Sequence, residues 1–457
     1  MYQAAKLVLE SDLTVDVQTS GVHDSAVTVW GPNATLVTSA SLTSMGNEGT
    51  ITGNGTYSGT TIEIAGGKVI NKVNTAVYHP QNGTLTVKDA YIEGATGIEM
   101  RAGELTVSGN AEIVATGEFS VGANPSGGTL TGVAIGISQH STNLPITVSL
   151  EGGTYTSENG YALYETDVQD PSAGDIAAIS ITAGDFAGKI YSENAEGFIE
   201  GTGVTFSEAV DYSYFAEDVI AVAGDKGYVT ESGSYTAYIE QDGVRVGYAS
   251  LQQAVNAIPS GNTEPVTIYI VDVDGDGVVE GGGVKVGSES GDTKNVIIDF
   301  GDLTYTVINP TVGSSGTETN GFQLLRGSKV VMQNGTLKAG TDAAAILIQK
   351  YCDLELIDMT IDVRGSNVQY AVSNNNGTTT FKGETDVYAR EGWFAFDVCA
   401  WSSYGDVAVV FDESFTGSVE GKVEYSYYGT VPAGWEDKLD ITFAEGNEGD
   451  YNINNRG

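Results

Sequence analysis

Hydrophobic and polar residues alternate in short runs along most of this chain. Val, Ile, Leu, Thr and Tyr alternate with small or polar residues, and Gly, Asn or Asp interrupts the runs roughly every 5 to 10 positions. A period of two is typical of strands that bury one face, whereas an amphipathic helix needs a period of 3.6. The pattern therefore predicts many short strands and very little helix.

The short strands recur at a nearly constant spacing. In the first half, three apolar pairs recur after 20 or 21 residues: Val77 and Ile98, Leu85 and Leu105, and Ile92 and Ile113. In the second half, steps of 24 to 26 residues separate three triplets: Phe322, Ile346 and Ala371; Met332, Leu356 and Phe381; and Leu337, Ile361 and Val387. Three short strands in such a period are typical of one turn of a parallel β-solenoid, whose strands stack about 4.8 Å apart. We therefore expect the members of each set to stack in a core.

One segment has a helical period. Residues 250–259 place apolar side chains at i, i+3, i+4 and i+7, begin with a Ser250–Gln253 capping-box pair and end at Pro259. The sequence thus predicts an all-β protein made of two parallel β-helices, with one short capping α-helix near 250–258; the resemblance described below implies that they are right-handed. The expected segments are a first β-helix at 1–205, a Tyr-rich, hairpin-like connector at 206–248, a second β-helix at 249–437 and a polar tail at 438–457.

Four stretches of the second half resemble a known superfamily. They are YASLQQAVNA, VTIYIVDVDGDGVV, NVIIDFGDLTYTV and GFQLLRGSKVVMQNGTLKA. Together they resemble the right-handed parallel β-helix superfamily with the pectin-lyase-like fold, and within it the adhesin-like β-helical surface proteins of gut bacteria and their phages. The resemblance covers about 248–430 well and 50–205 more loosely. It implies an architecture and brings no catalytic signature.

Charge and cysteine content narrow the choice of partners and compartment. Sixty acidic and 20 basic residues leave a net charge of −40, which repels phosphate and disfavours nucleic acid and anionic membranes. No apolar run is long enough for membrane insertion, and no signal peptide is visible at the start of this chain. Cys352 and Cys399 lie 47 residues apart, which is close to two turns. Two turns separate the Cα atoms by roughly 9 to 10 Å, which is too far for a disulfide, so we expect free and mostly buried thiols. An extracellular or cell-surface location fits best, or a virion surface if the chain is phage-encoded.

An acidic loop follows the strand expected at 266–271. Asp272, Asp274 and Asp276 occupy positions one, three and five of a calcium loop, but position twelve is Gly283, where a bidentate Glu belongs. Glu280 could contribute through water. Weak calcium binding is one interpretation, and a polar corner between two strands is the other. No other cofactor is indicated.

Aromatic residues are dense between 388 and 435. The candidate ligand-binding residues are Trp393, Trp401, Tyr404 and Trp435. Large rings can close the end of a β-helix, and exposed rings beside acids can stack on sugars. Both interpretations stay open at this stage.

Catalysis has little support in the sequence. The three histidines are His23, His79 and His140, so the second half lacks the Gly-His-Gly that a polygalacturonase-like site would need. The favoured hypothesis is a non-enzymatic, adhesin-like surface protein that binds a polysaccharide or cell-surface glycan. A phage fibre or capsid-decoration protein, expected as a homotrimer, is one alternative. A polysaccharide lyase or glycoside hydrolase is the other.

Overall fold

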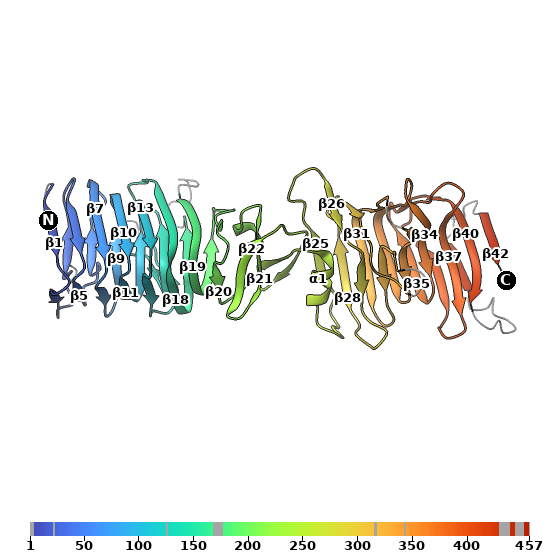
Figure 1. Cartoon of the computed structure of the whole chain (residues 1–457), viewed down its shortest axis with the longest axis horizontal. Coiled ribbons are helices and arrows are strands. Elements are labelled where there is room, and N and C mark those ends of the chain that lie inside the picture. The colour runs from blue at the N-terminus through green and yellow to red at the C-terminus, as the bar shows by residue number, and fades with distance from the viewer. Residues whose placement is uncertain are drawn as a thin grey trace. The chain divides into compact units, whose positions relative to one another are not determined.

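The computed structural model is an all-β protein with large parallel sheets and, in the described ranges, one α-helix (Figure 1). It describes residues 4–21, 23–124, 127–167, 177–314, 318–341, 344–428, 439–443 and 452–456. The chain divides into two compact units, Met1–Gly233 (unit 1) and Ser234–Gly457 (unit 2). This boundary falls inside the segment 206–248 that the sequence assigns to a connector.

In unit 1 the strands up to β11 pair in parallel with the strand three places later, and the pairing continues in three columns. The first column contains β1 (Lys6–Leu9), β4 (Thr35–Thr38), β7 (Ser58–Ala65), β10 (Asn82–Lys88) and β13 (Gly103–Ser108). The second contains β2 (Thr14–Asp16), β5 (Ser41–Ser44), β8 (Lys68–Asn71), β11 (Tyr91–Gly94) and β14 (Glu112–Ala115). The third contains β3 (Val27–Val29), β6 (Ile51–Gly53), β9 (Thr75–His79), β12 (Thr96–Met100) and β17 (Val133–Ser138).

All three columns meet the long strand β18 (Ile146–Thr166), which pairs in parallel with β19 (Ala177–Ser192). A short antiparallel pair, β15 (Ser120–Val121) and β16 (Leu130–Thr131), lies in the connection between β14 and β17. The unit ends in β20 (Thr205–Phe206), the 3₁₀ turn η1 (Tyr212–Tyr214) and an antiparallel pair, β21 (Val219–Gly224) and β22 (Gly227–Ser232).

The repeat predicted for the first half is confirmed. Val77 pairs with Ile98, Leu85 with Leu105 and Ile92 with Ile113, and all six side chains are buried. Because successive side chains of a strand point to opposite faces, a shift of one residue would expose the whole apolar set. The apolar spacing therefore determines the register.

Unit 2 has the same kind of parallel pairing. One column contains β25 (Val266–Ile270), β28 (Asn295–Asp299), β31 (Lys329–Ala339), β33 (Asp353–Asp362), β35 (Gly377–Lys382), β38 (Val407–Phe411) and β41 (Leu439–Phe443). A second contains β26 (Val278–Gly281), β29 (Thr304–Val307), the later parts of β31 and β33, β36 (Asp386–Tyr388) and β39 (Val419–Glu420). A third contains β27 (Val284–Val286), β30 (Phe322–Leu324), β32 (Ala344–Lys350), β34 (Asn367–Asn374), β37 (Phe394–Trp401), β40 (Lys422–Tyr428) and β42 (Asn452–Arg456).

The stacking predicted for unit 2 is right in two columns and wrong in the third. Met332, Leu356 and Phe381 stack as predicted, and so do Leu337, Ile361 and Val387. Phe322, however, pairs with Ile348 rather than Ile346, and Ile348 pairs with Val372 rather than Ala371. The pairing of β32 with β34 also contains a register shift between Ala345 and Ile346, so the assumption of a constant spacing fails in this column.

Unit 2 begins with an antiparallel pair and the predicted helix. Strands β23 (Ala237–Gln241) and β24 (Val244–Tyr248) precede α1 (Leu251–Ala257), and β23 also pairs with β25. Ser250 caps α1 by accepting a hydrogen bond from Gln253 N at 3.2 Å. The apolar face of α1 joins the core of unit 2. Cys352 and Cys399 are free and buried, as predicted.

Candidate functional site

The structure separates the aromatic residues that the sequence grouped. Trp393 precedes β37, whereas Trp401 ends that strand and Tyr404 follows it. An eight-residue strand places its two ends roughly 23 Å apart. Trp393 lies under the guanidinium of Arg390 at 4.6 Å, and the Trp401 and Tyr404 rings contact each other with centroids 5.8 Å apart. Trp435 lies outside the described residues.

The rings of the aromatic segment divide between the core and the surface, and sugar stacking stays a prediction. The phenylalanines fill the core: Phe381, Phe396, Phe411 and Phe415 are buried and in mutual ring contact. Trp393, Trp401 and Tyr404 are half-buried at the surface. The Trp401 indole donates to Asn375 Oδ1 at 2.7 Å, which fixes its orientation.

The acidic loop 272–280 forms a tight turn between β25 and β26. Asp272 accepts hydrogen bonds from Gly275 N at 2.8 Å and Gly277 N at 2.7 Å, and Asp276 accepts one from Val278 N at 2.8 Å. Glu280 lies in β26, and Asp274 is exposed. Within the described ranges, no group of three or more His, Cys, Asp or Glu side chains is arranged to hold a metal ion. The turn accounts for Asp272 and Asp276, and calcium binding stays a prediction.

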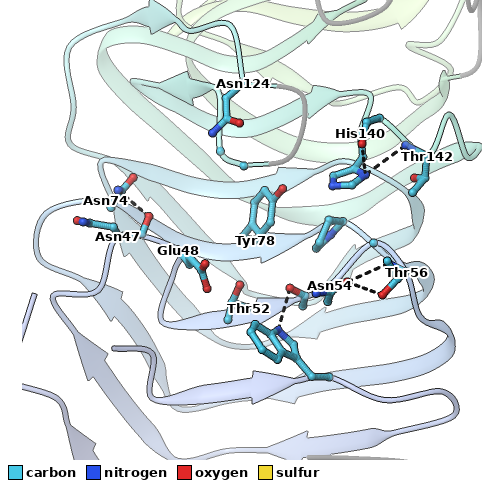
Figure 2. A pocket seen from close by; sticks show the side chains of 17 residues that line it. Asn47, Glu48, Thr52, Asn54, Thr56, Asn74, Tyr78, Asn124, His140 and Thr142 are labelled. Carbon is cyan, nitrogen blue, oxygen red and sulfur yellow. Dashed lines mark hydrogen bonds between the residues drawn. The ribbon is translucent and has the colours of Figure 1, made fainter. Parts of the chain in front are cut away.

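A polar pocket that the sequence did not reveal lies in unit 1, beside the third column of strands (Figure 2). Its volume is about 660 Å³. Its walls come from the ends of β3 and β6, from Asn47 and Glu48 before β6, and from β9 with its neighbours Asn74 and Pro80. Asn124, Gly127, Gly128 and the segment 140–142 complete them. The side chains that matter most for its chemistry are Trp30, Glu48, Thr52, Asn54, Tyr78 and His140.

Strand register places the floor of the pocket. Ile51 pairs with Val77, and both side chains are fully buried in the core. The next residues, Thr52 and Tyr78, also pair, and therefore share the opposite face of the sheet, toward the pocket. Figure 2 shows Tyr78 amid the side chains that line the pocket.

Two hydroxyl groups on this floor are buried without a partner. Tyr78 is 5% exposed and Thr52 is 1% exposed, and neither hydroxyl has a hydrogen-bond partner among the described residues. Burial raises the pKa of Tyr78, so its hydroxyl keeps its proton at neutral pH. A buried polar group left unsatisfied costs roughly 1–3 kcal/mol. A ligand with hydroxyl groups could satisfy both.

Ring and amide groups complete the walls. The Trp30 indole donates to Gly53 O at 3.2 Å, which holds the ring in place. Asn54 Oδ1 accepts from Thr56 N at 3.0 Å, in a turn at the end of β6. Glu48 Oε2 lies 3.1 Å from His23 Nδ1, and the His23 ring packs edge-on against Trp30. The pocket thus combines an aromatic ring, amides and one carboxylate.

His140 forms part of the wall as a neutral imidazole. Burial, together with the charge of Arg101, lowers its pKa. Its Nδ1 accepts a hydrogen bond from Thr142 N at 3.3 Å (Figure 2). Lys and Arg are absent from the described residues that line the pocket, so it offers no cationic side chain at neutral pH.

A buried ion pair holds two walls of the pocket. Arg101 and Glu99 are both fully buried, 3.4 Å apart. Arg101 donates to Gln139 O at 3.0 Å and to Asn124 O at 3.2 Å, and also to Gly127 O. Burial raises the pKa of the Glu99 carboxyl, while Arg101 and the Thr129 donors lower it. The pair therefore anchors Asn124, Gly127, Thr129 and Gln139 to the end of β12.

Comparison with family models, with curated proteins and with solved structures found no match to this chain. In the described part of the chain, no helix is both long and apolar enough to cross a membrane.

Proposed function

We propose that this protein is a surface-exposed, non-enzymatic interaction protein that recognises a glycan through the pocket of unit 1. The observation that carries the proposal is the pair of buried, unpartnered hydroxyls, Tyr78 OH and Thr52 Oγ1, beside the Trp30 ring. Sugars present hydroxyl groups around an apolar ring face. Such a ligand can satisfy buried hydroxyls and pack on an indole at the same time.

We further propose that each unit is a right-handed parallel β-helix. Three columns of parallel strands with a repeated step in each unit support this architecture. The net charge of −40 supports a protein that stays apart from nucleic acid and anionic membranes. An adhesin-like role at a cell surface fits a repeated scaffold that positions a preformed pocket.

The pocket favours binding over hydrolysis. Most glycoside hydrolases need two carboxyl groups, about 5–9.5 Å apart across the bond that is cleaved. Among the described residues that line this pocket, Glu48 is the one carboxylate. The Glu99 carboxylate is fully buried against Arg101 and Thr129. A ligand could therefore be held without being cleaved.

A glycan array followed by calorimetry tests the proposal. We expect the intact chain to bind at least one glycan, Trp30→Ala to weaken that binding at least about tenfold, and Tyr78→Phe to weaken it by roughly 2- to 10-fold, the value of one hydrogen bond. Tyr228→Phe, which removes a hydroxyl from β22 far along the chain, is the matched control and should bind normally. No binding by the intact chain, or normal binding by both pocket variants, would refute the proposal.

A further inference from the structure

A column of paired residues extends from the pocket along the same face of the sheet. Strand pairing aligns, in order, Thr52, Tyr78, Glu99, Gly136, Tyr164 and Tyr191. Their neighbours in sequence, such as Val77, Ile98 and Ile135, are fully buried in the core. Because side chains alternate along a strand, all six column positions share the face on which the pocket lies.

The far end of this column is an aromatic patch, which consists of Phe119, Tyr161, Tyr164 and Tyr191. Centroid distances are 4.5 Å for Phe119–Tyr161 and 4.9 Å for Tyr161–Tyr164. Tyr164 and Tyr191 stack at 5.0 Å with an interplanar angle of 22°. Tyr191 is 36% exposed and the other three rings are half-buried. The patch thus presents ring surface to solvent, outside the core.

The pocket and the aromatic patch share one chain segment. The connection 117–132 between β14 and β17 supplies Phe119 to the patch and Asn124, Gly127 and Gly128 to the pocket wall. Tyr164 lies three strand steps from Tyr78 and Tyr191 lies four, which corresponds to about 14 and 19 Å. The two sites therefore lie at least this far apart within one unit, and Thr129 and Leu130 cover Glu99 and Gly136 between them.

We propose that the aromatic patch is a second binding site for the same glycan, so that the ligand is an extended, neutral polysaccharide rather than a single sugar. One sugar unit occupies the pocket, and a unit about 14 to 19 Å along the chain stacks on Tyr164 and Tyr191. This inference rests on the proposed function. The absence of Lys and Arg from the described lining of the pocket, together with Glu48, disfavours anionic sugars. Two linked contacts bind far more tightly than either alone, because the second is intramolecular.

A length series tests the proposal with the full chain. The probes are β-1,4-linked glucose and N-acetylglucosamine oligomers of one to eight units, with oligogalacturonides as anionic counterparts. We expect affinity for a neutral series to rise at least about tenfold once the oligomer can span both sites, and the anionic series to bind more weakly. Tyr164→Ala/Tyr191→Ala should remove the rise and leave the affinity for the single sugar unchanged. Tyr238→Ala/Tyr269→Ala removes a similar stacked pair, with centroids 4.8 Å apart, from unit 2 and should keep the rise.

Each outcome has one meaning. An affinity that does not rise with length, or a rise that persists in the Tyr164/Tyr191 variant, overturns the second site and leaves the pocket standing. Preferred binding of oligogalacturonides overturns the neutral assignment. Binding of none of the three series overturns the proposed function and this inference with it. If the double variant does not fold, Tyr191→Thr, at the most exposed of the four rings, must weaken binding of the long oligomers alone.

Discussion

Replacing Arg101 by Met tests how the pocket walls are held. Met fills much of the same volume but has no charge and no donors. The substitution leaves Glu99 buried without its cation and removes the donors to the carbonyl groups of Asn124, Gly127 and Gln139. Breaking a buried ion pair by removing one partner costs about 3–5 kcal/mol. We therefore expect the free energy of unfolding of unit 1 to fall by about 4 kcal/mol.

The double variant Arg101→Met/Glu99→Leu separates the charge from the hydrogen bonds. Removing the stranded carboxylate should recover about 1–4 kcal/mol of the loss. Recovery stays incomplete, because the carbonyl groups of Gly127 and Gln139 lose the guanidinium donors, and the Thr129 N–H, which donates to Glu99 at 2.8 Å, loses its acceptor. The double variant should thus lie between the single variant and the parent.

Urea titration followed by circular dichroism measures these free energies, and hydrogen exchange over residues 96–142 localises the loss. The matched control is Lys382→Met, which breaks the more exposed 2.6 Å pair with Glu355 and should cost less than about 1 kcal/mol. A cost below about 1 kcal/mol for Arg101→Met, or a double variant less stable than the single, would refute the anchoring role of the pair.

Three further predictions concern unit 2. Leu356→Ala should lower the free energy of unfolding by about 2–5 kcal/mol in a denaturant titration, because the side chain is fully buried. The control Val278→Ala, at a position that is 42% exposed, should change it by less than about 0.5 kcal/mol. Burial raises the pKa of Asp397 to about 7, so the folded state keeps a proton that the unfolded state releases near pH 4. The free energy of unfolding should therefore fall as the pH rises from 4 to 7, and Asp397→Asn should flatten that part of the profile. An equal slope in both proteins would contradict the assignment. Asp272→Ala should lower the free energy of unfolding by about 1–2 kcal/mol with or without calcium, because both carboxylate oxygens accept hydrogen bonds from backbone N–H groups. A loss of stability that thermal melts show only in the presence of calcium would instead favour an ion in the loop.

The strand repeat could be predicted because each column uses apolar residues at a nearly constant spacing. Val77 and Ile98 show this, since burial on one face requires the same register in each step. Ile346 shows the limit: its column contains a bulge, and no local feature of the sequence marks the extra residue. Residue spacing therefore predicts the pairing of strands more reliably than it predicts which side chains contact each other.

The pocket could not be predicted in the same way. Its residues come from separate segments between 30 and 142, and two of its walls depend on Arg101, whose burial has no signal in the sequence. Aromatic density pointed to 388–435, where much of it reflects phenylalanines of the core. One residue of the pocket nevertheless stands out in the sequence, because Trp30 is the one tryptophan before residue 393.

The connection between β14 and β17 makes the proposed binding face of unit 1 partly independent of the strand register. Ile98 and Ile135 pair directly although 37 residues separate them, against 21 for Val77 and Ile98, so the core register is indifferent to the length of the intervening chain. Doubling a surface loop costs only about 0.6 kcal/mol in closure entropy. Mutation can therefore change the length of this segment with little change in strand register, provided that Gly127 and Thr129 keep their hydrogen bonds to Arg101 and Glu99, while it reshapes the pocket wall and the Phe119 contact together. Length variation in this one connection would accordingly alter the wall of the pocket and the aromatic patch together, while Thr52 and Tyr78 keep their places on the strands.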